Sequence, residues 1–346
     1  RRASDIHIKY NNPPILRIDG SLVRLTEYPM MDDAGIRNLL VELTDEKDRI
    51  KFDKLLEMDT SYMFGDIARF RVNACVDDGH TRIVMRLIPI KLKSIEDLRL
   101  PMALRKMCQM KNGLILFTGP TGSGKSTSLA AMIEEINMTR PDHIITVEDP
   151  LEFVHDDKLG IVTHREVGHD TLSFANALRG ALRQDPDVIL IGEMRDTETV
   201  RTAMASAETG HLVFSTLHTV DAVATLNRIM EFFEPHQHLQ IRKQLASVLR
   251  CICSQRILPA AGGSGRLVAC EVLVGTRTIR DFIDQGKSFK EIVNIIEEGR
   301  DQWGMQTFDQ ALYDLWKAKE ITTEIALLNA TSAKDLKSRM QGSALQ

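Results

Sequence analysis

The spacing of hydrophobic positions along the chain changes near residue 100. Before that point, short stretches alternate apolar and polar residues, which predicts strands with one buried face. A turn sequence over residues 77–79 predicts a hairpin. Apolar residues at 36, 39, 40 and 43, preceded by the potential capping residue Asp32, predict one helix. The strands expected in this small α+β module are residues 5–10, 15–18, 22–25, 68–76 and 81–87.

From residue 114 onward, almost wholly apolar runs alternate with amphipathic segments. Such alternation predicts a parallel sheet whose faces are covered by helical crossovers. The expected strands are 114–118, 143–147, 188–191, 212–216 and 267–274, and short helices should follow at 279–285, 289–298 and 308–317. The sequence therefore predicts an α/β protein. Its expected parts are an α+β N-terminal domain (1–88), a linker (89–100), an ATPase-type core (101–275) and a helical C-terminal subdomain (276–346).

A glycine-rich segment follows the first of these apolar strands. Residues 119–126 read Gly-Pro-Thr-Gly-Ser-Gly-Lys-Ser and match the P-loop pattern. The glycines let backbone N–H groups turn towards phosphate oxygens, Lys125 adds a positive charge, and Ser126 can reach Mg²⁺. The helix expected to begin near Lys125 adds its positive end. The predicted ligands are ATP and Mg²⁺, and the predicted contacts are Gly119, Thr121, Gly122, Ser123, Gly124, Lys125, Ser126 and Thr127.

Carboxylates follow two of the predicted strands. Glu193 comes just after the run 188–191 and is expected to hold Mg²⁺, although aspartate is commoner at that position. Glu148, Asp149 and Glu152 follow the strand at 143–147, and α/β sheets bind ligands at the carboxyl ends of their strands. One of these three could orient the water that attacks the γ-phosphate. An acidic loop at the surface is the alternative that the spacing leaves open.

Histidines and arginines give further candidates. His218 follows the strand at 212–216, at the predicted nucleotide edge, where a donor could sense the γ-phosphate; a structural role is equally compatible with its position. By spacing alone, His211 at the start of that strand is structural. Arg69, Arg71 and Arg86 lie on the polar face of the N-terminal hairpin. They form either a solvated edge or a set of guanidinium groups that binds phosphate.

Composition narrows the class of protein. The chain has 44 Lys and Arg against 48 Asp and Glu, and aromatic residues make up only 5%. This balance disfavours a nucleic-acid binder, which usually has excess basic residues and aromatic side chains for base stacking. No apolar run reaches the roughly 20 residues of a membrane helix. Five cysteines without paired C-x-x-C spacing indicate a reduced, cytoplasmic protein.

Taken in order, these motifs resemble the secretion ATPase superfamily, and within it the twitching-motility ATPases that retract type IV pili. The resemblance covers nearly the whole chain, including segments 3–7, 17–20, 69–73, 119–126, 145–152, 210–218 and 304–311. It implies a PAS-like N-terminal domain, a RecA-like ATPase domain and a homohexameric ring. It also implies roles by position: Glu152 as catalytic glutamate, Glu193 as the acid beside Mg²⁺, His211 and His218 as a histidine pair at the nucleotide, and Arg71 and Arg86 as phosphate-facing arginines.

The resemblance further implies a motor at the inner-membrane base of the pilus machine. Its partner would be the pilus platform protein in that membrane, with a sister retraction ATPase as a second partner; neither nucleic acid nor direct membrane insertion is expected. One segment departs from the family: residues 278–283 read Thr-Ile-Arg-Asp-Phe-Ile instead of Ala-Ile-Arg-Asn-Leu-Ile. Three alternatives stay open: an accessory retraction-associated ATPase, a RecA-like nucleic-acid translocase and a nucleotide-gated scaffold that does not hydrolyse ATP.

Overall fold

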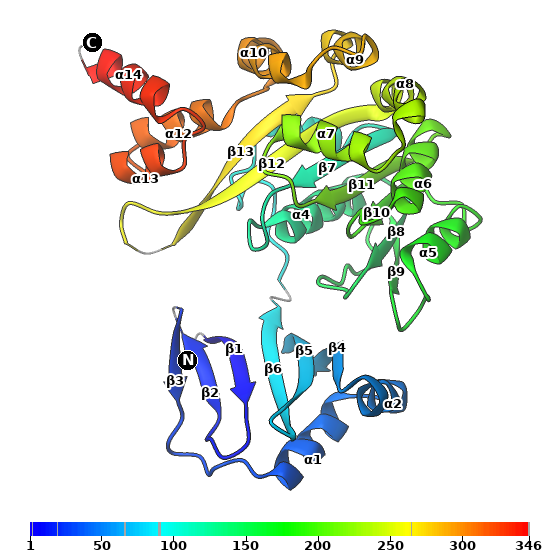
Figure 1. Cartoon of the computed structure of the whole chain (residues 1–346), viewed down its shortest axis with the longest axis vertical. Helices are drawn as coiled ribbons and strands as arrows, with labels where there is room; N and C mark the ends of the chain where they lie inside the picture. Colours follow the sequence, from blue (N-terminus) through cyan, green and yellow to red (C-terminus); the bar gives the residue numbers. More distant parts are fainter. Residues whose placement is uncertain (2, 19, 66, 89–90, 264, 345–346) are drawn as a thin grey trace. The chain divides into compact units, whose positions relative to one another are not determined.

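The computed structural model describes residues 1, 3–18, 20–65, 67–88, 91–263 and 265–344 (Figure 1). The chain divides into two compact units, one of residues 1–92 with 150–154 and one of residues 93–149 with 155–346. This division keeps the C-terminal helices in the same unit as the ATPase core, whereas the sequence suggested a boundary at residue 276. Residues 89–90 of the expected linker lie outside the described residues.

The N-terminal unit is a six-stranded antiparallel sheet in the order β3-β2-β1-β6-β5-β4, with two helices. Its elements are β1 (Ala3–Ile8), β2 (Ile15–Ile18), β3 (Ser21–Arg24), α1 (Asp33–Leu43), α2 (Glu46–Leu55), β4 (Glu57–Phe64), β5 (Ala68–Asp77) and β6 (His80–Ile88).

Local sequence explains two of these features. Asp32 accepts a hydrogen bond from the N–H of Gly35 and caps α1, as predicted. Asp78 and Gly79 both have positive φ angles, of 54° and 78°, which is the geometry of a two-residue hairpin turn between β5 and β6. β4 was not predicted from the sequence, because most of its residues are exposed or half-buried and little apolar alternation is visible.

One face of this sheet packs against the helices. Ile36 and Leu40 of α1 share a buried cluster with Val72, Ala74 and other residues of β5 and β6. Because side chains alternate across a strand, Arg71 lies on the opposite face of β5. The predicted separation of apolar and arginine faces holds for Arg71 and Arg86, whereas Arg69 is buried and its Nη2 donates to Oγ of Ser61 at 3.0 Å.

The ATPase unit is built on a seven-stranded sheet in the order β13-β12-β7-β11-β10-β8-β9. All neighbouring strands are parallel except β13, which runs antiparallel to β12. This sheet confirms the predicted α/β class. The strands are β7 (Gly113–Thr118), β8 (His143–Glu148), β9 (Ile161–Glu166), β10 (Val188–Ile191), β11 (Leu212–Leu217), β12 (Leu249–Pro259) and β13 (Arg266–Val274). β9 and β12 were not predicted from the sequence, since polar residues interrupt the apolar run of each.

Helices follow or separate these strands. The helices of this unit are α3 (Met102–Met107), α4 (Lys125–Thr139), α5 (Phe174–Ala181), α6 (Thr197–Glu208), α7 (Ala222–Glu231), α8 (His238–Val248), α9 (Arg277–Asp284), α10 (Ile292–Glu298), α11 (Arg300–Trp303), α12 (Phe308–Lys317), α13 (Thr323–Leu328) and α14 (Ala333–Ala344), with short 3₁₀ turns at Pro235–Gln237 and Phe289–Glu291.

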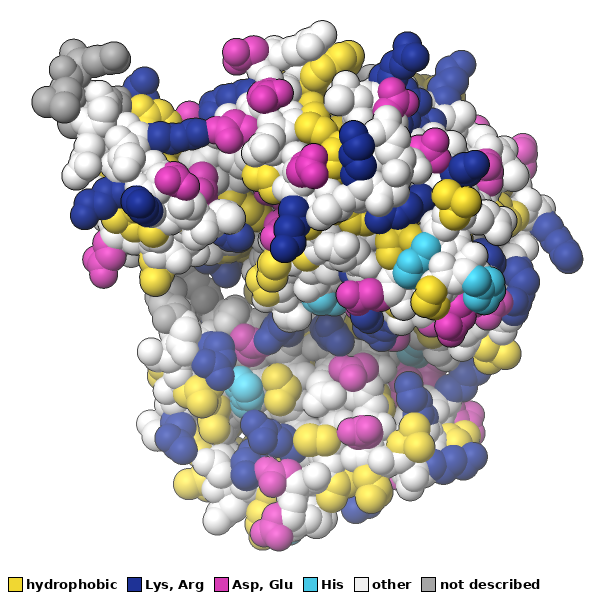
Figure 2. Space-filling view, turned by 45° about the horizontal axis from the view of Figure 1, so that its top comes forward, with side chains coloured by type: hydrophobic (Ala, Val, Ile, Leu, Met, Phe, Trp, Pro, Cys, Tyr) yellow, Lys and Arg dark blue, Asp and Glu magenta, His cyan; other side chains and the backbone are white. Residues whose placement is uncertain are grey.

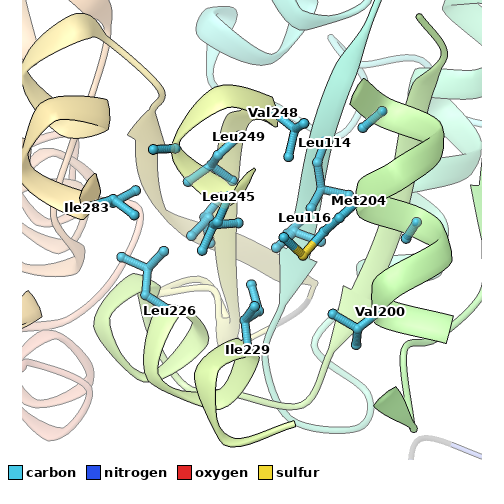
Figure 3. Packing of buried hydrophobic residues seen from close by; sticks show 14 of the residues in the cluster. Leu114, Leu116, Val200, Met204, Leu226, Ile229, Leu245, Val248, Leu249 and Ile283 are labelled. Carbon is cyan, nitrogen blue, oxygen red and sulfur yellow. The ribbon is translucent and has the colours of Figure 1, made fainter. Parts of the chain in front are cut away.

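The inner strand β7 is buried on both faces, as its unbroken apolar run predicted. Leu114 and Leu116 contact the cluster formed by α6, α7 and α8 (Figure 3). Ile115 and Phe117 point the other way, into the cluster formed with α3 and α4. Burial on both sides fixes the strand that leads into the P-loop.

The C-terminal helices α12, α13 and α14 form a further apolar cluster with the ends of β12 and β13. A complete capping box begins α12: Thr307 accepts from the N–H of Gln310, and the Gln310 side chain accepts from the N–H of Thr307. Among the described residues, none of the helices has the length and hydropathy to cross a bilayer.

Candidate nucleotide-binding site

The order of the strands brings the predicted site segments of the ATPase unit to one edge of the sheet. β7, β11, β10 and β8 are consecutive neighbours and all run parallel. Their carboxyl ends carry, in that order, the P-loop, His218, Glu193 and the pair Glu148–Asp149. This is the edge at which open α/β sheets bind ligands.

The P-loop backbone depends on its glycines. Gly119, Gly122 and Gly124 have φ angles of 142°, 82° and 88°, a region that other residues rarely adopt. A Cβ atom on Gly119 would lie 2.5 Å from the carbonyl oxygen of Gln255 on β12, so a larger residue would push the loop from the sheet. Gly124 ends the loop and is the N-cap residue of α4.

Lys125 is held inside the loop and is only 8% exposed. Its Nζ donates to the carbonyl oxygens of Gly119 at 2.7 Å and Pro120 at 3.1 Å. Ser126 and Thr127 are half-buried on the first turn of α4, beside Lys125. A buried ammonium, a hydroxyl and the positive end of a 15-residue helix fit the phosphates of a nucleotide and an accompanying Mg²⁺.

A chain of charged side chains crosses the neighbouring strand ends. Glu193 Oε1 lies 3.3 Å from Nε2 of His218, and Glu193 Oε2 accepts from Nε of Arg195 at 2.7 Å. Nη1 of Arg195 lies 3.7 Å from Oδ2 of Asp149. The structure therefore brings Glu193 and His218 together as the sequence suggested. It adds Arg195, which was not predicted from the sequence; its position two residues after the strand-end carboxylate Glu193 was the available signal.

Buried hydroxyls hold these strand ends in register. Thr216 Oγ1 donates to the carbonyl of Gly192 at 2.7 Å, and Ser215 Oγ donates to the carbonyl of Ile191 at 2.9 Å. Gly192 itself packs closely on β8, since a Cβ there would lie 3.3 Å from the Glu148 Cα. These contacts fix the backbone on which Glu193 is mounted.

His211 lies at the opposite end of β11. Its Nδ1 is 2.9 Å from the carbonyl oxygen of Ser206 and 3.3 Å from Oγ1 of Thr209, at the C-terminal end of α6. A six-residue strand separates it from His218, a length of roughly 20 Å. Within one chain, His211 therefore does not lie beside the P-loop. The family resemblance had implied that it would contact the nucleotide.

Three predicted residues belong to the N-terminal unit. Glu152 is half-buried in the segment 150–154, four residues after the end of β8. Arg71 and Arg86 are direct partners across the β5–β6 pair. Like charges placed directly opposite each other repel, which favours an anion between or beside them.

Asp5 offsets only part of this positive charge. Nε of Arg86 donates to Oδ1 of Asp5 at 2.8 Å, while Nε of Arg71 lies 3.8 Å from the exposed Asp59. Burial raises the pKa of Asp5, but hydrogen bonds from Arg86 and Ser4 outweigh it, so the pKa lies below its usual value. The Arg86 side chain remains 67% exposed and can bind another anion.

Comparison with known proteins identifies the family. Residues 1–321 match the family described as Type II/IV secretion system protein. The chain belongs to this family. The "Type IV pilus retractation ATPase PilT" of Pseudomonas aeruginosa is 43% identical over 313 residues, which are 90% of each chain. The "Type IV pilus ATPase PilU" of the same organism is 41% identical over 334 residues, 96% of this chain and 87% of PilU.

A solved structure, that of the pilus retraction motor PilT with bound ADP, is similar to this chain with a TM-score of 0.90 and 43% identity. It covers 97% of this chain, and this chain covers 95% of it. With the P-loop and the strand-end acids, these likenesses show a secretion-family P-loop ATPase with a PAS-like and a RecA-like part.

Proposed function

We propose that this protein is a Mg²⁺-dependent ATP-hydrolysing motor that powers the retraction of type IV pili. The observation that carries the proposal is the group at one sheet edge, where a P-loop with a buried lysine adjoins the Glu193–His218 pair. The ADP-bound retraction motor that shares its fold supports the choice of nucleotide. The 43% identical pilus retraction ATPase supports the choice of process.

Each residue of the edge has a proposed task. Lys125 and the loop N–H groups bind the β- and γ-phosphates, and the P-loop glycines keep these N–H groups available. Bound Mg²⁺ would neutralise phosphate charge, and Ser126 and Glu193 are the residues that would hold it. His218 shares the Glu193 carboxylate and senses the γ-phosphate from the next strand.

Hydrolysis additionally needs groups that the N-terminal unit carries. Glu152 orients the attacking water, since a carboxylate can accept its proton as the bond to phosphorus forms. Arg71 and Arg86 stabilise the charge that develops on the γ-phosphate of ATP bound by the same chain. Their exposed guanidinium groups and mutual repulsion support this role.

The motor acts as a ring of six chains at the cytoplasmic side of the inner membrane, where it drives the pilus platform protein. The retraction ATPase and its PilU relative, both similar over most of this chain, support this setting. The nucleic-acid translocase is less well supported, because basic and acidic side chains are interspersed on the face shown in Figure 2. The net charge of −4 agrees with that view.

An accessory motor that assists a sister ATPase is the second candidate. The observation that favours it is the segment 278–283, which departs from the retraction pattern and lies on α9. Ile279, Phe282 and Ile283 are buried there, whereas Arg280 is exposed. Of the altered residues only Phe282 is buried, beside the unaltered Ile279 and Ile283, so the helix keeps its packing and the unaltered Arg280 stays exposed for a partner.

Deletion of the gene tests the proposal. Cells that lack the protein should carry excess surface pili and lose twitching motility. The wild-type gene should restore motility, and a gene encoding Lys125→Ala should not. Normal motility in the deletion strain while a sister motor is present would favour the accessory role. Normal motility after deletion of both would contradict any part in retraction.

A further inference from the structure

A buried network ties the chain just beyond Glu152 to the helix that begins at the P-loop. His155 has a side chain only 2% exposed, and its Nδ1 lies 3.0 Å from Oε2 of Glu134 on α4. The Lys158 ammonium pairs with the other oxygen of the same carboxylate. Burial raises the pKa of Glu134, but the hydrogen bonds from His155 and Lys158 bring it down to about 2. The carboxylate is therefore an acceptor only, and Nδ1 of His155 carries the proton.

The backbone beyond His155 is held by the same helix. Nδ2 of the fully buried Asn137 donates to the carbonyl of Asp156 at 2.8 Å. The carbonyl of Asn137 accepts from the N–H groups of Leu159 and Gly160, each at 3.1 Å. Residues 155–160 are thus fixed to α4, the helix whose first residue is Lys125.

His164 of β9 fixes the same point from the sheet. Its Nε2 accepts from the N–H of His155 at 3.1 Å, and its Nδ1 lies 2.9 Å from Oγ1 of Thr146 on β8. The two imidazole rings are stacked, with centroids 5.9 Å apart. The carbonyl oxygen of His155 lies 3.3 Å from the same Nε2, so both backbone groups of His155 contact this nitrogen. His164 therefore bridges β8 and the start of the anchored loop.

Glu152 is only three residues along the chain from His155, one of the anchored residues. Asp149, beside Arg195, stands at one end of the segment 150–154, and His155 stands at the other. Glu152 is three residues from each, so its Cα lies within about 11 Å of both. We propose that His155 and His164 are positioning residues, which hold Glu152 at the distance hydrolysis needs. This inference rests on the proposed function, in which Glu152 orients water.

Replacement of His164 tests the anchor. His164→Ala should lower kcat about 10- to 100-fold, the scale expected when a catalytic group is misplaced by an ångström. The ATP affinity should stay unchanged, because the P-loop is intact. His164→Gln should recover most of the loss, since its amide oxygen can accept from the N–H of His155. Lys111→Met is the control: that lysine is exposed in the same unit and lies outside this network, so kcat should stay at the wild-type value.

A double-mutant cycle with Glu152→Gln separates positioning from general damage. If His164 acts through Glu152, then His164→Ala should cause no further loss of single-turnover hydrolysis in the Glu152→Gln chain. An equal fold-loss in both backgrounds would overturn the positioning role and leave the role of Glu152 standing. Normal turnover by Glu152→Gln itself would rule out both the positioning role of His164 and the catalytic role of Glu152. If His164→Ala does not bind ATP, Thr146→Val takes its place in the cycle, because that change removes only the hydroxyl group that contacts Nδ1 of His164.

Discussion

Nε2 of His218 lies 3.3 Å from Oε1 of Glu193, and this contact joins the carboxyl ends of β11 and β10 beside the P-loop. The two residues are 25 positions apart in the chain, and only the parallel pairing of their strands brings them together. Buried hydroxyls under both strand ends keep this pairing fixed. Glu193 and His218 should therefore act as one unit in hydrolysis.

We expect Glu193→Gln and His218→Ala to be non-additive. Each single variant should lower kcat. The fold-loss of kcat in the double variant should be smaller than the product of the two single fold-losses, which corresponds to a coupling free energy of roughly 1 kcal/mol or more. Steady-state ATPase rates of the four chains give this value. His211→Ala is the control partner, because it lies at the other end of β11 and should combine with Glu193→Gln additively. Additivity of Glu193 and His218 would show that their contact has no part in catalysis.

Lys125→Ala should abolish detectable ATP binding or weaken it by about 100-fold or more, since a charge-assisted contact to two phosphates is lost. Titration calorimetry measures the affinity. Lys125→Arg should also bind poorly, because the 8% exposed side chain has no room for a planar guanidinium. Lys111→Ala, an exposed lysine of the same unit, is the control and should bind ATP normally. Near-normal affinity in Lys125→Ala would remove the P-loop assignment.

Arg71→Ala and Arg86→Ala should bind ATP but hydrolyse it slowly, by a factor of about 10³ if they act like the arginines of other NTPases. Arg71→Ala should leave the stability of the N-terminal unit nearly unchanged, because its side chain lies outside the apolar core, whereas Arg86→Ala also removes a hydrogen bond to the buried Asp5 and should lower that stability. Rates and affinities of the purified chains check both expectations.

Mixed assemblies test whether the arginine serves the nucleotide of its own chain. Arg71→Ala chains are mixed with Lys125→Ala chains before assembly. The proposal predicts inactive mixtures, since neither chain has both groups. Substantial recovery of ATPase activity would mean that the arginine reaches a neighbour's nucleotide.

Glu271 should make stability depend on pH. It is buried on β13, where its Oε1 accepts from the N–H of Ala222 at the start of α7. Burial and, to a lesser extent, the charges of Asp221 and Asp309 raise its pKa from 4.5 to about 7 despite that hydrogen bond. Between these two values the folded chain holds a proton that the unfolded chain releases. The free energy of unfolding should therefore fall as pH rises from 4.5 to 7, by an amount on the order of 3 kcal/mol.

Urea unfolding at a series of pH values measures this effect. Glu271→Gln keeps the acceptor oxygen but cannot ionise, so this contribution should be absent from its profile. Glu298→Gln, at an exposed position of α10, should retain the wild-type profile. A wild-type slope in Glu271→Gln would show that another group is responsible.

The sequence was most informative where one local pattern determines structure. The unbroken apolar run of β7 and the glycines at 119, 122 and 124 required a buried strand and a loop with positive φ angles, and both are present. Asp32 likewise marked the start of α1. By contrast, β4 and β12 carry polar residues whose burial depends on neighbouring strands, so their own pattern did not reveal them.

Contacts between side chains of different helices, strands and loops could not be predicted from such local patterns. Glu134 and His155 are 21 residues apart, on a helix and a loop, and their pairing follows from how α4 packs on the sheet. Arg195 became recognisable only when β10 and β8 were placed side by side. For His211 the sequence pattern was misleading. Its place in a motif suggested a nucleotide contact, but it precedes the first residue of β11 and so lies at the end of the strand away from the P-loop.

ATP binding and ATP turnover by Glu152→Gln directly test whether Glu152 is the catalytic carboxylate. The change keeps the shape of the side chain and removes the charge that orients water. We expect wild-type ATP affinity by calorimetry and a kcat lowered by about 100-fold or more. Glu148→Gln, measured in parallel, should retain more of the activity. Normal turnover by Glu152→Gln together with an inactive Glu148→Gln would contradict this role of Glu152, because Glu148 would then be the carboxylate that hydrolysis needs.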